Sequence, residues 1–274
     1  MKLFIKKQLF SLLIILAVSV SCYKSVDVPE EDVIESSEFT QKLLIEDYTG
    51  TWCSNCTGAG HAIESAVDDN DRFIPVAIHY SAGTNGDPMH SDLSVSLVSA
   101  YNPSGSFPQV SLNRVASIWA NDYLVTTLND KLNKYAPVGL AINSSISDDK
   151  INLTVQVGFV EEATVVNGYK MVAYLLEDGL IYPQHNSSLP DLPEIIEDYE
   201  HNNVLRFSFT NVFGDELPNQ VADNHRYSKD FNNIALPNNV ENSANLKIVA
   251  FVLDANNNCL NIQVAHLGSD KDFD

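Results

Sequence analysis

Hydrophobic and polar positions follow two different patterns along the chain, with a change near Pro137. Before Pro137, short β-prone apolar runs alternate with segments whose apolar residues recur at every third or fourth position, which is typical of one helix face. Strands that alternate with helices indicate an α/β layer with at least one parallel connection. The predicted strands are 42–48, 73–79 and 109–113. One predicted helix shows its apolar face from residue 59 onward, and the other two cover 91–101 and 118–135.

After Pro137 the pattern is that of strands, several of which alternate between apolar and polar residues. Asn256-Asn257-Asn258 is a polar turn between the last two predicted strands, which indicates a hairpin. Because this half has no long helical period, we interpret it as a second, all-β sandwich domain. The predicted strands are 138–147, 151–160, 169–177, 204–210, 246–254 and 260–266.

The N-terminus has the features of an export signal followed by a tether. Residues 9–20 form a mostly apolar run behind a cationic start, shorter than the ~20 residues that a bilayer requires. The segment resembles a bacterial lipoprotein signal, which implies removal of residues 1–21 and acylation of Cys22, for example with palmitate. Residues 22–38 are polar and acidic and are expected to be a tether. An ordinary cleaved signal with an incidental cysteine is the alternative.

The charge of the chain narrows the expected partners. The 274 residues include 16 Lys and Arg against 36 Asp and Glu, a formal net charge of -20. Residues 1–21 contain Lys2, Lys6 and Lys7 and no acid, so their removal leaves 13 basic residues and a charge of -23. Such a surface repels nucleic acid and anionic lipid headgroups, so neither is expected as a partner.

Three cysteines remain when Cys22 carries lipid. Cys53 and Cys56 form a Cys-Ser-Asn-Cys pair, while Cys259 stands alone in an apolar strand and is expected to be a small buried hydrophobe. An exported compartment permits disulfides, so the pair has three interpretations: a structural clip, a metal site or a redox centre. No second Cys/His pair completes a ligand set with His61 or His79, so neither a metal nor another cofactor is expected.

The surroundings of the pair favour redox exchange. It follows a predicted strand, has Trp52 directly before it and opens a predicted helix. A helix N-terminus stabilises a thiolate and lowers its pKa below the ~8.5 of a free thiol. We therefore expect Cys53 to be exposed and to be the nucleophile, and Cys56, one turn deeper, to resolve the mixed disulfide. A structural disulfide of such a short loop gains little loop-closure entropy.

Residues 39–136 resemble thioredoxin in two motifs. Leu44-Ile45-Glu46-Asp47-Tyr48 before Trp52-Cys53-Ser54-Asn55-Cys56 resembles its active-site stretch, and Gly105-Ser106-Phe107-Pro108-Gln109-Val110 resembles its cis-proline segment. The resemblance implies that Asp47 lies buried under the dithiol and moves the proton of Cys56. It also implies that Phe107–Pro108 is cis and that its backbone faces Cys53. Ser54-Asn55 and His61 depart from the family pattern.

The second half resembles the Omp28 family of Gram-negative outer-membrane lipoproteins. The motifs are Leu175 to Ile181, Gln184, and Tyr199 to Arg206. The resemblance implies an outer-membrane location and a thioredoxin-like α/β domain (39–136) followed by an immunoglobulin-like β-sandwich (137–274). Within these motifs, His201 and Arg206 are expected to make structural hydrogen bonds. Asp87, in a loop before the second helix, is expected to be a turn or cap residue.

Two functions agree with these residues. The first is an envelope thiol-disulfide oxidoreductase that acts on exported thiol-containing proteins, with Cys53, Cys56, Asp47 and Pro108 as its site and Cys22 as its membrane anchor. The second is a non-catalytic surface binding or adhesion lipoprotein, in which the pair is a structural disulfide and the fold is a scaffold. The exposure and the pKa of Cys53 distinguish the two.

Overall fold

The computed structural model describes residues 39–118, 124–133, 135–160, 168–218 and 226–274, all of which belong to one compact unit. The predicted signal 1–21, the tether 22–38 and the lipidation site Cys22 lie outside these ranges. Within them, no helix has the length and apolar character needed to cross a membrane.

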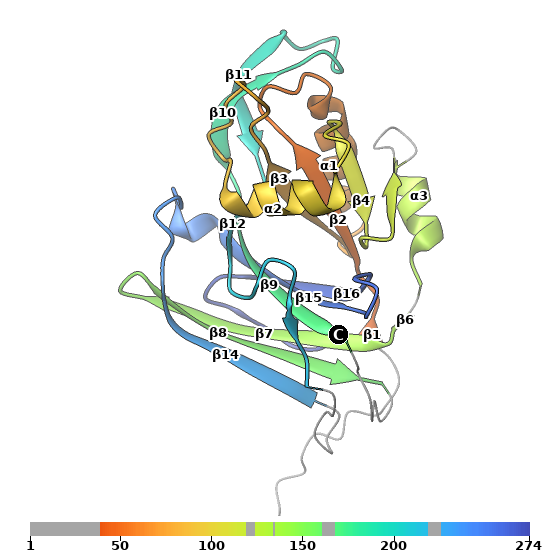
Figure 1. Ribbon diagram of the computed structural model, residues 1–274, viewed down its shortest axis with the longest axis vertical. Helices are drawn as coiled ribbons and strands as arrows, with labels where there is room; N and C mark the ends of the chain where they lie inside the picture. Colours follow the sequence, from red (N-terminus) through yellow and green to blue (C-terminus); the bar gives the residue numbers. More distant parts are fainter. Residues whose placement is uncertain (1–38, 119–123, 134, 161–167, 219–225) are drawn as a thin grey trace, which may run out of the picture. The chain divides into compact units, whose positions relative to one another are not determined.

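The first part of the chain has the predicted alternation of strands and helices. β2 pairs in parallel with β3, from Leu43 opposite Phe73 to Thr49 opposite His79, and antiparallel with β4. α1 and α3 pack on one face of these strands, and α2 packs on the other (Figure 1). The elements are β2 (Leu43–Thr49), α1 (Cys56–Asp69), β3 (Phe73–His79), α2 (Asp92–Tyr101), β4 (Gln109–Leu112), β5 (Ala116–Ile118) and α3 (Leu124–Lys131).

The third predicted helix, 118–135, is wrong in extent. α3 covers only Leu124–Lys131, with Leu124 and Leu128 buried against α1. Ile118 instead lies opposite Val110 in the antiparallel pair of β4 and β5, because the sheet edge offers it backbone partners. Residue 135 belongs to β6 (Tyr135–Ala136), which pairs with β1 (Phe39–Thr40). Residues 119–123 and 134 lie outside the described ranges.

The sheet continues into the second half of the chain. Its strand order is β16-β15-β9-β12-β3-β2-β4-β5, with β13 paired to β9. β12 joins the halves, because Val204 pairs in parallel with Ala77 of β3 while β12 pairs antiparallel with β9 from Val204 to Ser208. The expected domain boundary after residue 136 therefore does not coincide with a break in the sheet. The added strands are β9 (Lys170–Glu177), β12 (Val204–Ser208), β13 (Asp215–Glu216), β15 (Leu246–Leu253) and β16 (Cys259–His266).

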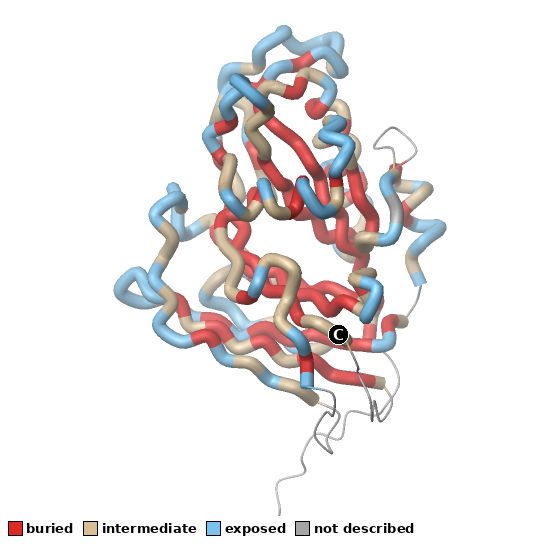
Figure 2. The backbone as a smooth tube through the Cα atoms, viewed as in Figure 1, coloured by how far each residue is buried: buried red, intermediate tan, exposed pale blue. Residues whose placement is uncertain are grey.

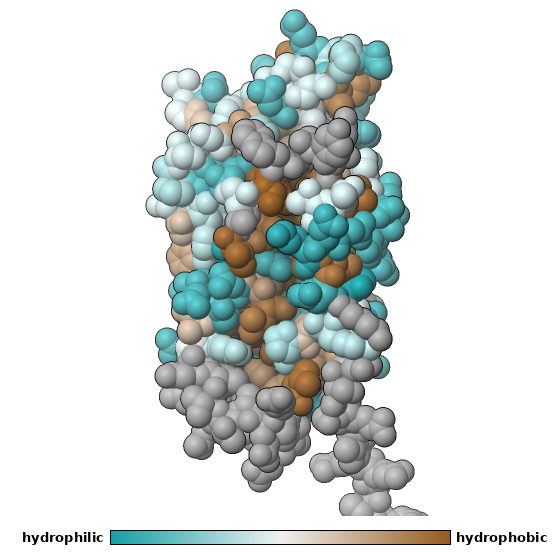
Figure 3. Space-filling view, turned by 90° about the vertical axis from the view of Figure 1, so that its right-hand side faces the viewer, coloured by the Kyte–Doolittle hydropathy of each residue, from teal (hydrophilic) through white to brown (hydrophobic). Residues whose placement is uncertain are grey.

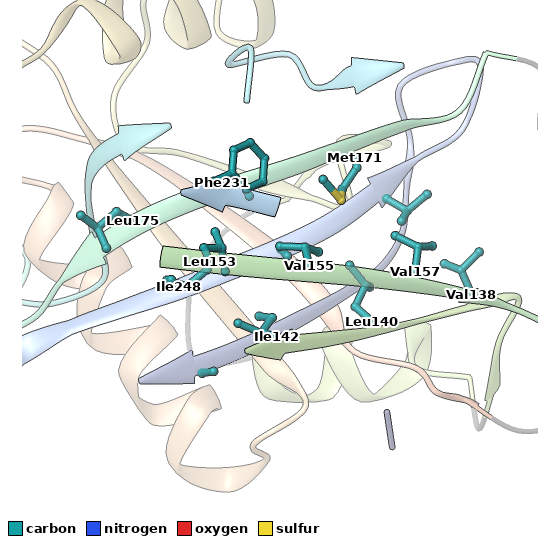
Figure 4. Close-up of a cluster of buried hydrophobic side chains, with 14 of the residues drawn as sticks. Val138, Leu140, Ile142, Leu153, Val155, Val157, Met171, Leu175, Phe231 and Ile248 are labelled. Carbon is teal, nitrogen blue, oxygen red and sulfur yellow. The ribbon is translucent and has the colours of Figure 1, made fainter. Parts of the chain in front are cut away.

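A separate antiparallel sheet packs against β9 and β15. Its order is β14-β8-β7-β17, with β7 (Val138–Ser147), β8 (Lys150–Phe159), β14 (Arg226–Ala235) and β17 (Asp270–Lys271). Alternate residues of β7 and β8 point into the shared core, as the period of two predicts. Figure 4 shows this core, which includes Val138, Leu140, Ile142, Leu153, Val155, Val157, Met171, Leu175, Phe231 and Ile248.

Two hairpins complete the second half. The predicted hairpin of β15 and β16 is confirmed, and Asn257 in its turn has a φ of 65°. The hairpin of β10 (Leu180–His185) and β11 (Ile195–His201) is not predicted by the sequence, because its residues are largely polar and exposed. It ends in a mostly exposed tip (Figures 1 and 2). A short 3-10 helix (Ser243–Asn245) precedes β15.

The surface mixes polar and apolar groups. On the face shown in Figure 3, apolar residues form a narrow central band among hydrophilic ones. Such mixing is ordinary, since folded proteins do not have enough polar surface to cover themselves.

Candidate functional site

Cys53 and Cys56 form a disulfide at the junction of β2 and α1. After Thr49 the chain turns, and the Cys53 N–H donates to the Gly50 carbonyl at 2.9 Å. A second turn follows, in which the Cys56 N–H donates to the Cys53 carbonyl at 3.1 Å. α1 begins at Cys56, so the pair lies at the positive end of the helix dipole.

Two predictions about Cys53 are wrong. The sequence predicts that Cys53 opens the helix, whereas α1 begins three residues later, at Cys56. The sequence also predicts an exposed Cys53, whereas its exposed fraction is only 5%, close to the 3% of Cys56. A segment more than a hundred residues away in the chain lies against the loop that contains Cys53.

That segment, which we call the strap, comprises residues 184–188, where β10 ends and the hairpin loop begins. Its backbone pairs with the backbone of the cysteine loop. The N–H of His185 donates to the Thr51 carbonyl, and the N–H of Ser187 donates to the Ser54 carbonyl, both at 2.8 Å. These two bonds lie on either side of Cys53, so the strap holds the loop along its length.

Side chains strengthen the contact between the strap and the loop. Nε2 of Gln184 donates to the Cys53 carbonyl at 3.0 Å. The Thr57 hydroxyl, in the first turn of α1, donates to Oδ1 of Asn186 at 2.8 Å. Gln184 and Asn186 are themselves buried, so these bonds are shielded from water and add to the stability of the closed loop.

Aromatic rings lie beside the same loop. Nε1 of Trp52 donates to the Tyr80 carbonyl at 2.7 Å, and the Phe107 ring contacts both the Trp52 ring and the Tyr80 ring, with centroids 5.3 and 5.7 Å apart. The Phe107–Pro108 bond is cis, which confirms that prediction. The contact of Pro108 with Cys53 stays a prediction.

Asp47 lies in the centre of the sheet, on β2 between β3 and β4. Its exposed fraction is 7%, and its Oδ1 atom has no hydrogen-bond partner in the described part of the chain. Burial raises the pKa of Asp47 to about 7, although the nearby His79 opposes the rise. The predicted burial of Asp47 is therefore confirmed, and its part in proton transfer stays a prediction.

Asp47 and Cys56 line a common cavity of about 50 Å³. His79 at the end of β3 and His201 at the end of β11 also line it, with their ring centroids 5.0 Å apart. Tyr199 of β11 is a further wall residue. From the sequence, His79 is a candidate metal ligand and His201 is expected to make structural hydrogen bonds, and neither expectation brings the two together. Their meeting depends on the pairing of β12 with β3, which no local pattern reveals.

Comparison with known proteins gives one family match. The family described as outer membrane protein Omp28 matches residues 94–271, which is more than half of the chain. The chain belongs to the Omp28 family. This confirms the outer-membrane location expected from the sequence. The match covers the strap, His201 and Arg206, but it begins after Cys56.

Two solved structures are similar to this Omp28 protein. HBP35 of Porphyromonas gingivalis is 18% identical, with a TM-score of 0.66, over 84% of this chain and 76% of that chain. This likeness shows a shared fold. A domain of the outer membrane lipoprotein Omp28 from Porphyromonas gingivalis is 20% identical, with a TM-score of 0.32, over 48% of this chain and 89% of that chain. No curated protein matches the chain.

A buried ion pair in this Omp28 protein lies on the opposite face of β2 from Asp47. Nη2 of Arg114 donates to Oε1 of Glu46 at 2.7 Å, and both side chains have no exposed surface. The guanidinium also donates to the Tyr174 hydroxyl at 3.1 Å and lies 4.6 Å from the centre of the Tyr101 ring. Glu46 is a charged residue inside an apolar strand, which is the sequence feature that could have indicated a buried ion pair here.

The remaining candidates have structural surroundings. Cys259 is buried on β16, as predicted, and burial raises the pKa of its thiol. Nε of Arg206 lies 3.1 Å from Oε2 of the buried Glu177. Their alignment falls short of a hydrogen bond, so we describe the contact as an ion pair. Oε1 of Glu177 accepts the N–H groups of Glu241 and Asn242, so this pair anchors the loop before β15.

Proposed function

We propose that this protein is an envelope lipoprotein whose Cys53–Cys56 pair exchanges disulfides with exported thiol-containing proteins. Cys22 carries the lipid anchor, and residues 22–38 tether the body to the outer membrane. Residues 39–136 form a thioredoxin-like domain, and residues 137–274 form an immunoglobulin-like β-sandwich. The parallel pair of β2 and β3 with helices on both faces supports the first assignment, and the two-sheet core around β7 and β8 supports the second.

The observation that carries this proposal is the buried Oδ1 atom of Asp47, which has no hydrogen-bond partner in the described ranges, in a residue that lines the same cavity as Cys56. Raising its pKa from 3.8 to about 7 corresponds to a penalty of about 4 kcal/mol for the ionised form in the folded protein. A disulfide that only clips a loop gains nothing from such a group. An exchanging dithiol does, because a base with a pKa near neutral can accept the proton of Cys56.

The proposed exchange proceeds in two steps. The Cys53 thiolate attacks one sulfur of a partner disulfide, and the other partner sulfur leaves with the electron pair of the broken bond. Cys56 then gives its proton to Asp47 and attacks the sulfur of Cys53, which releases the first partner sulfur as a thiolate. The partner gains two electrons and becomes a dithiol, while the Cys53–Cys56 disulfide forms. Because Cys53 is buried, the strap must move before the first step.

The burial of Cys53 favours a second function. A disulfide closed under the strap agrees with a non-catalytic binding or adhesion lipoprotein, in which the pair stabilises the loop. In that case the disulfide belongs with structural disulfides, whose potentials typically lie below about -300 mV.

A redox titration decides between the two. The soluble domain from residue 39 is equilibrated in glutathione buffers of graded potential, and the fraction of reduced Cys53–Cys56 is measured by thiol alkylation and mass shift. The exchange function predicts a midpoint above about -270 mV, within the range of known thiol-exchange proteins. A midpoint below about -300 mV would assign the pair to the structural class instead.

A further inference from the structure

The cavity beside Cys56 is lined by a second acid–base group besides Asp47. This group is His79, which contacts Asp87. The cavity volume of about 50 Å³ is room for about three to five water molecules, since each needs about 10 to 15 Å³. Asp47 lines this cavity, and its buried Oδ1 atom has no hydrogen-bond partner among the described residues. A buried carboxyl oxygen without a protein partner is satisfied best by such water, which also conducts protons.

His79 stands on the same face of the sheet as Asp47. Asp47 lies opposite Ala77 in the parallel pair of β2 and β3, and His79 follows Ala77 by two residues. Side chains two apart on a strand share a face, so both reach the cavity. The proximity of Asp47 and His79 therefore follows from the pairing register of β2 and β3 and does not depend on a loop.

Asp87 holds the ring of His79. Oδ2 of Asp87 lies 2.9 Å from Nδ1 of His79 and also accepts the N–H of Thr51. Oδ1 of Asp87 accepts the N–H of Met89, which confirms the turn role expected from the sequence. Burial disfavours the carboxylate of Asp87, but these bonds and the charge of His79 outweigh burial and lower its pKa. An ionised Asp87 accepts a hydrogen bond from the Nδ1–H group of His79, so Nε2 is the atom left to accept or give a proton.

The other titratable groups around the cavity are neutral or acidic. Burial, followed by the neighbouring His79, lowers the pKa of His201 to about 3, so His201 is uncharged at neutral pH. Burial, together with Glu64 and Asp47, raises the pKa of Tyr199 to about 12, so the phenol keeps its proton. Burial also raises the pKa of Glu64, and Glu200 is the remaining acid on the wall. Of the two histidines that line the cavity, His79 is therefore the one that is free to act as a base beside Asp47.

We propose that His79, oriented by Asp87, is a positioning residue that exchanges a proton with Asp47 through water in this cavity. The inference rests on the proposed exchange function and names the group that takes the proton from Asp47. When Cys56 gives its proton to Asp47, the proton passes by water to Nε2 of His79, and the imidazolium pairs with the Asp87 carboxylate. Asp47 is thereby ready for the next turnover, and the proton leaves to solvent or to the departing partner thiolate.

The test replaces His79 with Gln, which can still donate to Asp87 but cannot carry charge. Two quantities are measured against pH: the carboxyl ¹³C shift of Asp47, which gives its pKa, and the rate of mixed-disulfide resolution. Loss of the positive charge should move the pKa of Asp47 upward by about one unit, and the midpoint of the rate profile should move with it. His201→Gln is the matched control, because it changes an uncharged histidine of the same cavity and should leave the pKa of Asp47 in place.

An unchanged pKa of Asp47 in His79→Gln, or an equal shift in His201→Gln, would overturn the inference. If His79→Gln does not fold, His79→Asn also removes the charge of the imidazole and should raise the pKa of Asp47 in the same direction. The pKa measurement needs no exchange activity. A wild-type protein that exchanges no disulfide therefore refutes the proposed function, while the ¹³C titration still reports whether His79 and Asp47 are coupled.

Discussion

Gly58 and Ser188 approach each other so closely that a Cβ atom added at Gly58 would lie 2.8 Å from the Cβ atom of Ser188. Glycine inside a helix destabilises it by roughly 0.5 to 1 kcal/mol relative to alanine. Here glycine lets the strap lie directly on the first turn of α1, over the disulfide loop. The glycine at position 58 of the helix is therefore required for close packing of the strap.

Replacing Gly58 with Ala should open the strap without harming the helix. Overpacking of a tight contact typically costs 1 to 3 kcal/mol, and that cost falls on the closed strap. We expect the disulfide to be reduced by dithiothreitol about tenfold faster, measured by stopped alkylation and mass shift. Gly60→Ala is the control, because its added Cβ would meet only the terminal hydroxyl of Tyr199, at 3.1 Å. Equal reduction rates in wild type and Gly58→Ala would show that the strap does not limit access to Cys53.

Replacing Asp47 with Asn should slow disulfide exchange by ~10 to 100-fold, since it removes the base that accepts the proton of Cys56. The rate of mixed-disulfide resolution is measured between pH 5 and 9. The wild-type rate should follow ionisation of a group with a pKa near 7, and the variant should lose that dependence. Identical profiles in the two proteins would leave Asp47 without a part in exchange.

The same substitution should change how stability depends on pH. The folded protein keeps a proton on Asp47 up to about pH 7, whereas the unfolded chain releases it near pH 4. The free energy of unfolding of the wild type should therefore fall as pH rises through this window, by up to about 4 kcal/mol relative to Asp47→Asn. Urea denaturation of both oxidised proteins at pH 4 and pH 8 measures the difference. A constant difference would contradict the raised pKa of Asp47.

Replacing Cys22 with Ser should release the protein from the membrane. The lipid would have no attachment atom, and residues 9–20 are too few to span a bilayer. Cell fractionation should find the variant in the soluble fraction and the wild type in the membrane fraction. A variant that remains in the membrane after cleavage of its signal would refute the anchor at Cys22.

Local patterns predicted the parts of this protein that local chemistry determines. β2 and β3 are apolar runs, and β7 and β8 alternate between apolar and polar residues. The residues of each of these strands are therefore enough to predict its burial. The resemblance to the thioredoxin active-site stretch, in which Asp47 stands six residues before Cys53, implied the burial of Asp47. The cis bond at Phe107–Pro108 followed from its motif.

Contacts between distant segments account for the errors. The sequence predicts an exposed Cys53 because the neighbouring residues are typical of a turn. The strap that packs against its loop comes from the second half of the chain. β10, β11 and β14 were missed because most of their residues are polar or exposed, so no clear apolar alternation marks them as strands. His79 and His201 meet only because β12 adds to the edge of β3.

The most direct test of the exchange function is capture of a mixed disulfide. The Cys56→Ser variant, expressed in the native envelope, keeps the attacking sulfur but cannot release a partner. Non-reducing electrophoresis should show adducts through Cys53 that disappear on reduction, and the Cys53→Ser variant should show none. If both variants lose a similar amount of stability and neither forms adducts, the pair is a structural disulfide, and the binding or adhesion function takes the place of the exchange function.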